Sequence, residues 1–216
     1  MKNVLKSTLL LVFLCFYIGL QAQTYRLEVG YNQPIRLGTT VSSTYFNGIR
    51  LGGTAEWGLK NNLSLLTGAL YNIVYANKLQ GYPNSATVTY RTFGHYLDIP
   101  LHINYTYPIT NLLKIFAYAG PNFNIGLFQN MKVISTQTYD VTNPMYVAPG
   151  NYDLYSSTSG EYQLNRINLQ LDLGGGVQWK KYQLKAGYDF GINYLNKTGA
   201  GNLNQQGWYV TVAYQF

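Results

Sequence analysis

The sequence predicts an all-β fold, an eight-stranded antiparallel up-and-down transmembrane β-barrel. Apolar and polar side chains alternate without interruption from residue 166 to residue 179, and a strand with this alternation has one apolar and one polar face. A tilted strand of about 9 to 11 residues already crosses a bilayer. The connections between successive alternating segments are long and short in turn, as in outer-membrane barrels with short periplasmic turns and longer outside loops.

The composition agrees with a single small barrel. The chain has 216 residues, among them 22 Tyr and 22 Gly, and only 11% of its residues are charged. No stretch beyond the N-terminus approaches the roughly 18 consecutive apolar residues of a membrane helix. A net charge of +7 could indicate nucleic acid, but basic residues are not clustered beyond Lys180 and Lys181, so we expect no nucleic-acid partner.

The N-terminus has the pattern of a secretory signal. Lys2 and Lys6 are followed by an apolar run over residues 8–20 and by a plausible cleavage zone. We therefore expect a signal peptide over residues 1–22 and the barrel domain over residues 23–216. A retained anchor helix is the alternative, and the shortness of the apolar run argues against it.

The first four expected strands are defined by alternating rows and by the turns between them. The strands are residues 25–32, 49–60, 63–75 and 94–107. Their outward rows are Leu27, Val29 and Tyr31, then Ile49, Leu51, Ala55, Trp57 and Leu59, then Leu65, Tyr71 and Ile73, then Leu97, Ile99, Leu101, Ile103 and Tyr105. In the third strand an even row competes, and we favour the odd row. Asn61 and Asn62 predict a tight turn because Asn tolerates positive φ, whereas residues 33–48 and 76–93 predict loops.

The last four expected strands continue the pattern with one change of parity. They are residues 112–127, 166–179, 182–194 and 207–216. Pro121 lacks an N–H, so the fifth strand should bend there. The odd row faces outward over residues 166–179, but the even row does so after a tight turn at Lys180 and Lys181. Residues 128–163 form the longest connection. The glycines from Gly174 to Gly176 predict bending and close backbone approach, because no helix follows that could make them a phosphate cradle.

Aromatic residues gather near both ends of the expected strands and favour a membrane protein. The set near the short turns is Tyr25, Trp57, Tyr105, Trp179, Tyr182 and Tyr214, and the set near the long loops is Tyr31, Tyr75, Tyr194 and Trp208. Two such girdles are typical of outer-membrane barrels. A secreted β-sandwich would also have alternating strands, but the strand length, the loop asymmetry and the aromatic ends argue against it.

Three stretches resemble the PorT-like outer-membrane β-barrel family over essentially the whole mature chain. They are Tyr96-Leu97-Asp98-Ile99-Pro100-Leu101, Gly174-Gly175-Gly176-Val177 and the aromatic C-terminus. The even number of expected strands returns both termini to the periplasm. The resemblance implies an outer-membrane location in a Gram-negative-type cell, and a part in protein secretion for some members. It also implies an assembly signal, read by the barrel-assembly machinery, at Trp208, Val210, Val212, Tyr214 and Phe216.

The inward rows carry charges of both signs. They are Arg26, Arg50, Lys60, Lys114, Arg166 and Lys185 against Glu28, Glu56, Asp98, Asp172 and Asp189, together with His102. An eight-stranded barrel is just wide enough to be filled by side chains, and buried charges are costly unless paired. We therefore expect an interlocked polar network in the lumen; a proton or ion path is the alternative.

The two histidines are weak candidates for catalysis. His102 lies two positions from Asp98 on the inward face, a pairing that could orient an imidazole, but no inward Ser stands at a suitable place. His95 lies at the loop end of its strand and could serve a lipid-modifying surface enzyme. With two histidines and, after signal removal, no cysteine, we expect no metal site, cofactor or thiol nucleophile.

The long connection is the best candidate for recognition. Its tyrosines, set among Ser, Thr and Asn, are Tyr139, Tyr146, Tyr152, Tyr155 and Tyr162. Tyrosines in such a context make amphipathic contacts typical of binding surfaces; a solvated cap is the alternative. We expect a non-enzymatic barrel in contact with outer-membrane lipid, a structural or interaction component, with a protein partner at its loops or periplasmic turns. A lipid-modifying enzyme and a narrow channel are the other candidates.

Overall fold

The structure is a computed structural model that describes residues 24–39, 43–81, 86–136, 147–157, 163–197 and 202–216. The expected signal peptide lies outside the described residues. The strands are β1 (Thr24–Gly38), β2 (Thr44–Tyr45), β3 (Asn47–Gly58), β4 (Leu63–Gly81), β5 (Thr87–Pro108), β6 (Leu113–Ser135), β7 (Gly150–Asp153), β8 (Ile167–Trp179), β9 (Tyr182–Gly191) and β10 (Leu203–Gln215).

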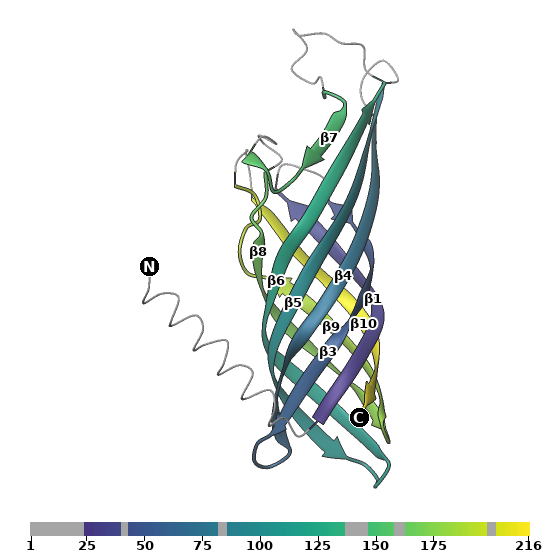
Figure 1. The fold of residues 1–216 in the computed structure, drawn as a ribbon, viewed down its shortest axis with the longest axis vertical. Coiled ribbons are helices and arrows are strands. Elements are labelled where there is room, and N and C mark those ends of the chain that lie inside the picture. Colours follow the sequence, from purple (N-terminus) through teal and green to yellow (C-terminus); the bar gives the residue numbers. More distant parts are fainter. Residues whose placement is uncertain (1–23, 40–42, 82–85, 137–146, 158–162, 198–201) are drawn as a thin grey trace, which may run out of the picture.

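Eight of these strands close into an antiparallel barrel (Figure 1), which confirms the predicted fold. Around the ring the order is β1, β3, β4, β5, β6, β8, β9 and β10, so each strand pairs with its neighbours in sequence. The ring closes where β10 pairs with β1, from Arg26 opposite Gln215 to Gly38 opposite Leu203. The two short strands are not part of the closed ring: β2 pairs with β1, and β7 pairs with β6.

The alternation of side chains follows the predicted parity. The odd row of β8, from Ile167 to Trp179, is mostly exposed, and its even row is largely buried. In β4 the odd row faces outward as favoured, because Leu66, Leu70 and Val74 are only 7%, 2% and 1% exposed. The even row of β9 and β10 faces outward. One face of every ring strand therefore lines the lumen and the other covers the outside.

The short turns join strands at one end of the barrel, which we call the short-turn end. The predicted tight turn at Asn61 and Asn62 is confirmed, with φ values of 56° and 63°, and two successive positive φ angles match the twist of a hairpin. Lys180 in the second tight turn has a φ of 55°. β1 begins and β10 ends at this same end (Figure 1).

The opposite end, which we call the long-loop end, differs from the prediction. Residues 76–93 were expected to be a loop, but β4 continues to Gly81 and β5 begins at Thr87. β6 likewise continues to Ser135. Val88, Thr89 and Tyr90 are β-branched or aromatic and extend the strand. The extended parts of β4, β5 and β6 form a sheet that rises above the barrel (Figure 1), which we call the protrusion.

Other strand ends also differ from the prediction, and the pairing of β5 with β6 is interrupted at two places. β1 runs on to Gly38, whereas β9 ends at Gly191, before the predicted residue 194. The register between β5 and β6 shifts at His95 and Tyr96. Pairing between these strands also skips the two positions opposite Gly120 and Pro121, where the proline has no N–H to donate. The bend at Pro121 stays a prediction.

A hydrophobic cluster buries the inner side of the protrusion. Its members, which we call the cap, are Val88, Met131, Val133, Leu154, Leu164 and Leu195. They come from β5, β6, the segment after β7 and the segments that flank β8 and β9. Tyr152 and Tyr155 pack against the cap. Segments remote in sequence are therefore packed together at the long-loop end by burial of apolar surface.

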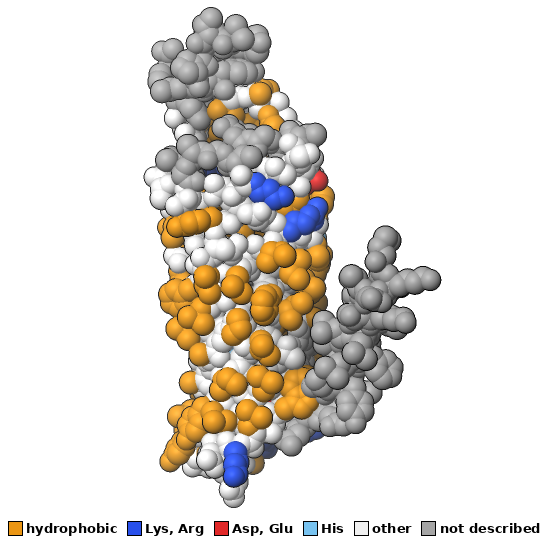
Figure 2. Space-filling model, turned by 90° about the vertical axis from the view of Figure 1, so that its left-hand side faces the viewer, with side chains coloured by type: hydrophobic (Ala, Val, Ile, Leu, Met, Phe, Trp, Pro, Cys, Tyr) orange, Lys and Arg blue, Asp and Glu red, His pale blue; other side chains and the backbone are white. Residues whose placement is uncertain are grey.

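The outside of the barrel carries a broad apolar belt (Figure 2). Leu, Ile, Val and Phe side chains are exposed along all eight ring strands. Tyr105, Trp179 and Tyr182 are exposed near the short-turn end, and Tyr31, Tyr75 and Trp208 lie exposed toward the other end. An apolar band between two aromatic girdles is the surface of a transmembrane barrel. Among the described residues no helix is long and apolar enough to cross a membrane.

Candidate functional site

The lumen is the most highly organised part of the molecule, and its polar side chains lie in layers. Nearest the short-turn end, Arg26 of β1 forms an ion pair with Glu56 of β3. Glu56 also accepts hydrogen bonds from the Ser64 hydroxyl and from Asn104 Nδ2, the latter at 2.9 Å. Both oxygens of the Glu56 carboxylate are thus engaged.

The next layer joins β9 to β1. Lys185 Nζ lies 2.6 Å from Glu28 Oε2. Thr54 donates a hydrogen bond of 3.0 Å to the other oxygen of Glu28, and Thr211 donates one of 3.4 Å to Oε2. Because both charged groups are buried, this pairing offsets the cost of removing them from water.

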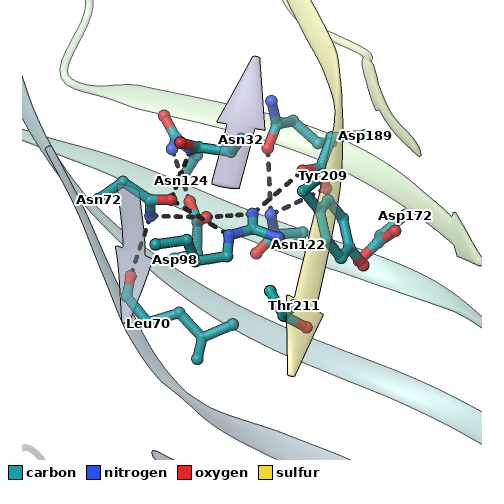
Figure 3. A network of polar contacts seen from close by, with 12 residues as sticks. Asn32, Leu70, Asn72, Asp98, Asn122, Asn124, Asp172, Asp189, Tyr209 and Thr211 are labelled. Atoms are coloured by element: carbon teal, nitrogen blue, oxygen red, sulfur yellow. Dashed lines mark hydrogen bonds and ion pairs between the residues drawn. The ribbon is translucent and has the colours of Figure 1, made fainter. Parts of the chain in front are cut away.

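Arg50 is the centre of a polar cluster whose other members include Asp98, Asp189 and Tyr209. Figure 3 shows these other members around the lumen. Arg50 Nη2 lies 2.5 Å from Asp98 Oδ2 and 3.1 Å from Asp189 Oδ2. Asn72, Asn122 and Asn124 contribute amides: Asn72 and Asn124 donate to Asp98, and Asn122 donates to Asp189. The guanidinium also lies over the ring of Tyr209, 4.1 Å from its centroid, so the cluster connects strands on opposite sides of the lumen.

His102 lies in the lumen, but its acidic neighbour is not the one expected. Asp98 is held by Arg50, whereas His102 Nε2 lies 3.3 Å from Asp172 Oδ2. Tyr209 donates a 2.6 Å hydrogen bond to Asp172 Oδ2, and the hydroxyls of Tyr209 and Tyr118 are 2.5 Å apart. The His102 ring stacks on Tyr118. Which side chains meet across the lumen depends on the tilt and stagger of the strands. The alternation along a single strand does not predict either quantity.

Three charges predicted for the lumen are exposed at strand ends, and one of them, Lys114, still lines the cavity that opens at the short-turn end. Arg166 is exposed just before β8, where its Nη1 donates to the carbonyls of Gly126 and Leu127. Lys60 is exposed in the turn after β3, and Lys114 is exposed at the rim of the short-turn end. Each stands at or beyond the end of its strand, where alternation no longer implies burial.

One lumen cation was missed. Arg36 is buried because β1 continues beyond Pro34, and it donates to Gln205, Tyr96 and Gln129. The alternation of β1, continued for four more residues, would have predicted its inward position. The charged side chains buried in the described lumen are Arg26, Arg36, Arg50 and Lys185 against Glu28, Glu56, Asp98, Asp172 and Asp189.

The middle of the lumen is filled. The space that remains beside Arg50, Asp98 and Asp189 measures about 20 Å³, which is room for about one water molecule. Above it Arg36 lies over the ring of Phe46, which is 1% exposed. The short-turn end is different: a cavity of about 410 Å³ opens there, with Arg26 and Glu56 in its wall.

Glycines of β8 and β9 provide the room for the lumen tyrosines. A Cβ added at Gly174 would collide with the Tyr118 hydroxyl, and one added at Gly187 would collide with that hydroxyl and would lie 2.6 Å from the Tyr209 hydroxyl. The close approach predicted at the glycine run is therefore confirmed at Gly174. The nearest atom there belongs to the side chain of Tyr118, and a backbone atom also lies close.

This crowding leads to a prediction for Gly187. We expect Gly187→Ala to lower the free energy of unfolding by about 1 to 3 kcal/mol, because it overpacks the lumen. Urea unfolding in lipid vesicles measures the change. Tyr118→Phe should restore part of the loss by removing one hydroxyl. Gly53→Ala is the matched control, since its added Cβ would meet nothing nearer than 3.7 Å; equal losses in Gly187→Ala and Gly53→Ala would contradict the packing argument.

His95 lies on the outside, at the long-loop edge of the belt. Its Nδ1 is 2.5 Å from the Tyr71 hydroxyl. Phe93 and Phe128 pack against its ring, with centroids 4.8 Å and 5.9 Å away. The contacts of this imidazole are thus one phenol and two aromatic rings.

The expected recognition tyrosines are only partly described. Tyr139, Tyr146 and Tyr162 lie outside the described residues, whereas Tyr152 and Tyr155 are partly buried against the cap. Tyr155 also lies under the guanidinium of Arg166. The residues predicted as an assembly signal, from Trp208 to Phe216, form the outward row of β10 and its end.

Comparisons with known proteins found a matching family model and similar solved structures. A family model described as an outer membrane protein beta-barrel domain matches residues 15–196. Neisserial surface protein A is 10% identical with a TM-score of 0.42, over 89% of this chain and 97% of that one. The attachment invasion locus protein Ail of Yersinia pestis is 11% identical with a TM-score of 0.37, over 89% and 98%. The outer membrane enzyme PagL is 12% identical with a TM-score of 0.37, over 87% and 98%. No curated protein matches the sequence.

Proposed function

The chain belongs to the outer membrane protein β-barrel domain family, and from that premise we propose that it is a non-enzymatic interaction component that presents the protrusion to a protein partner outside the membrane. The observation that carries the proposal is the extension of β4, β5 and β6 beyond the apolar belt. Strands of about 9 to 11 residues suffice to cross a bilayer, and β5 and β6 have 22 and 23.

The protrusion has the properties of a preformed interaction surface. Its inner side is packed by the cap, so the extended strands are supported by a buried core. Its outer side leaves Leu79 69% and Ile134 36% exposed. A surface that is ordered before binding loses less conformational freedom on association. These features support contact with a partner at the long-loop end.

The finer placement of the protein follows from its sequence. We propose that residues 1–22 are a signal peptide, that the short-turn end with both termini faces the periplasm, and that the outward row from Trp208 to Phe216 is read by the barrel-assembly machinery. The resemblance of residues 96–101 to PorT-like barrels supports a place in a secretion or surface assembly.

Two other functions remain as alternatives with their own observations. A lipid-modifying enzyme would use His95, which lies at the edge of the belt beside Tyr71; loss of turnover of labelled lipid in His95→Ala or His102→Ala would favour it. A narrow channel would need a continuous water path, and the space of about 20 Å³ at the middle of the lumen argues against one. Solute-selective conductance in planar bilayers would favour it.

Site-specific crosslinking in intact outer membranes tests the interaction proposal. With a photoreactive residue in place of Leu79 or Ile134, we expect discrete protein adducts that mass spectrometry can identify. The matched controls are Leu112 in a short turn, 53% exposed, and Val29 on the belt, 57% exposed. These positions are no less apolar, so adducts specific to the protrusion cannot arise from apolar exposure alone.

A cap variant links those adducts to the structure. Val88 is fully buried in the cap, and Val88→Asp would bury an unpaired charge there. We expect it to abolish the adducts while the barrel still migrates as a folded species in unheated gels. Adducts that persist in Val88→Asp, or that form equally from Leu112 and Val29, would contradict the proposal.

A further inference from the structure

The cavity at the short-turn end has the form of a ligand site. It measures about 410 Å³ and is lined by residues from the ends of most ring strands, among them Thr24, Glu56, Thr106 and Gln178. Cavities of about 300 to 1,000 Å³ are typical of small-molecule sites. Toward the middle of the barrel the lumen is filled, so the cavity is a pocket open at one end.

Arg26 in the wall of this cavity has unused hydrogen-bonding capacity. Its side chain is 5% exposed and pairs with Glu56 through Nη1. Its Nε is buried without a hydrogen-bond partner. A buried donor that lacks a partner is costly, and more so on a charged group. An acceptor oxygen that entered the cavity and reached this guanidinium would remove that cost.

The charges around the cavity favour an anion. Glu56 is already occupied by Arg26, Ser64 and Asn104. Lys114 stands exposed in the wall and has no ion pair among the described residues. The charged side chains of the lining are therefore two cations and one satisfied carboxylate.

Neutral donors add to this preference. Gln178 Nε2 donates to the side-chain oxygen of Gln215 at 3.0 Å. The amide of Gln215, which also lines the cavity, keeps its own N–H groups as donors. Amide and guanidinium donors together match the several acceptor positions of an oxyanion.

We propose that this cavity binds an oxyanion group, a carboxylate or a phosphate, on a ligand that enters from the short-turn end. The planar guanidinium of Arg26 binds two oxygens of such a group, because its fork matches both chemistries. Lys114 provides a second, exposed countercharge. This site lies at the opposite end of the barrel from the protrusion and does not depend on the interaction proposed there.

Titration of the purified protein in lipid nanodiscs tests the site. The probes are glutarate, inorganic phosphate and, as a neutral analogue, glutaramide, and the readout is the NMR shift of the Arg26 Nε–H and of the Gln215 side-chain amide. We expect saturable shifts with an anion and none with glutaramide. Shifts with glutarate but not phosphate would identify a carboxylate ligand, and the reverse a phosphate ligand.

Two substitutions separate this site from general charge effects. We expect Lys114→Gln to raise the anion Kd about fivefold, the effect of an exposed ion pair. Lys180→Gln removes a lysine at the same end, one that lies over Trp179 and not in the cavity wall, and should leave Kd unchanged. The pair Arg26→Gln with Glu56→Gln removes both partners of the ion pair and should abolish binding. Equal effects of Lys114→Gln and Lys180→Gln, equal shifts with glutaramide, or no anion-dependent shift in the wild type would each overturn the proposal.

Discussion

Arg50→Met will lower the free energy of unfolding by about 3 to 5 kcal/mol, the cost of removing one partner of a buried ion pair. Arg50 is 3% exposed and is the cation that contacts both Asp98 and Asp189. Its loss leaves two buried carboxylates facing each other without a countercharge. Urea unfolding in lipid vesicles, followed by tryptophan fluorescence, measures the change.

Restoring neutrality provides the internal control for Arg50. The triple variant Arg50→Met with Asp98→Asn and Asp189→Asn has no unpaired charge, and it should recover most of the lost stability because the cost comes from the orphaned carboxylates. Lys180→Met, an exposed turn substitution, should change little. An Arg50→Met protein that unfolds at the wild-type urea concentration would refute the central role of this cluster.

Leu173→Arg will destabilise the protein by about 2 to 4 kcal/mol in lipid, the cost of a cation at the bilayer midplane on a barrel surface. Leu173 is the middle residue of β8, on the outward row, and is 43% exposed. The same unfolding assay in vesicles measures the loss.

The control for Leu173 separates lipid from water. Leu112 is 53% exposed, but it lies in a short turn, where an arginine remains in contact with water. In a water-soluble protein Leu173→Arg and Leu112→Arg would cost about the same. If the two variants unfold alike in vesicles, the apolar belt does not face hydrocarbon.

Period-two alternation predicts well which face of the strand a residue lies on. It predicts poorly where the strand begins and ends. Arg50, Asp98 and Asp189 were predicted correctly in the lumen because each lies on the inward row of an alternating run. Arg36 was missed because residues 33–48, which are rich in Gly, Ser and Thr, predict a loop. Arg166 was misplaced for the opposite reason, since it precedes the first paired residue of β8.

Contacts across the lumen could not be predicted in the same way. His102 and Asp98 share a face of β5, yet His102 meets Asp172 of β8. Which lumen residues of different strands lie opposite each other depends on the stagger of the strands around the ring. That stagger is set by the register of all the strand pairs together. The protrusion was missed because residues 76–93 were predicted to form one loop, whereas β4 continues to Gly81 and β5 begins at Thr87.

The pairing of β1 with β10 has a consequence for how the molecule is made. Neighbouring strands elsewhere in the ring follow one another along the chain, whereas this seam joins Arg26 to Gln215, which are 215 − 26 = 189 positions apart. The C-terminal strand must therefore be complete before the cylinder can be sealed. Until then two long edges expose unpaired N–H and C=O groups, the kind of edge that recruits foreign strands. Assembly of this chain thus depends on shielding both edges until the seam closes.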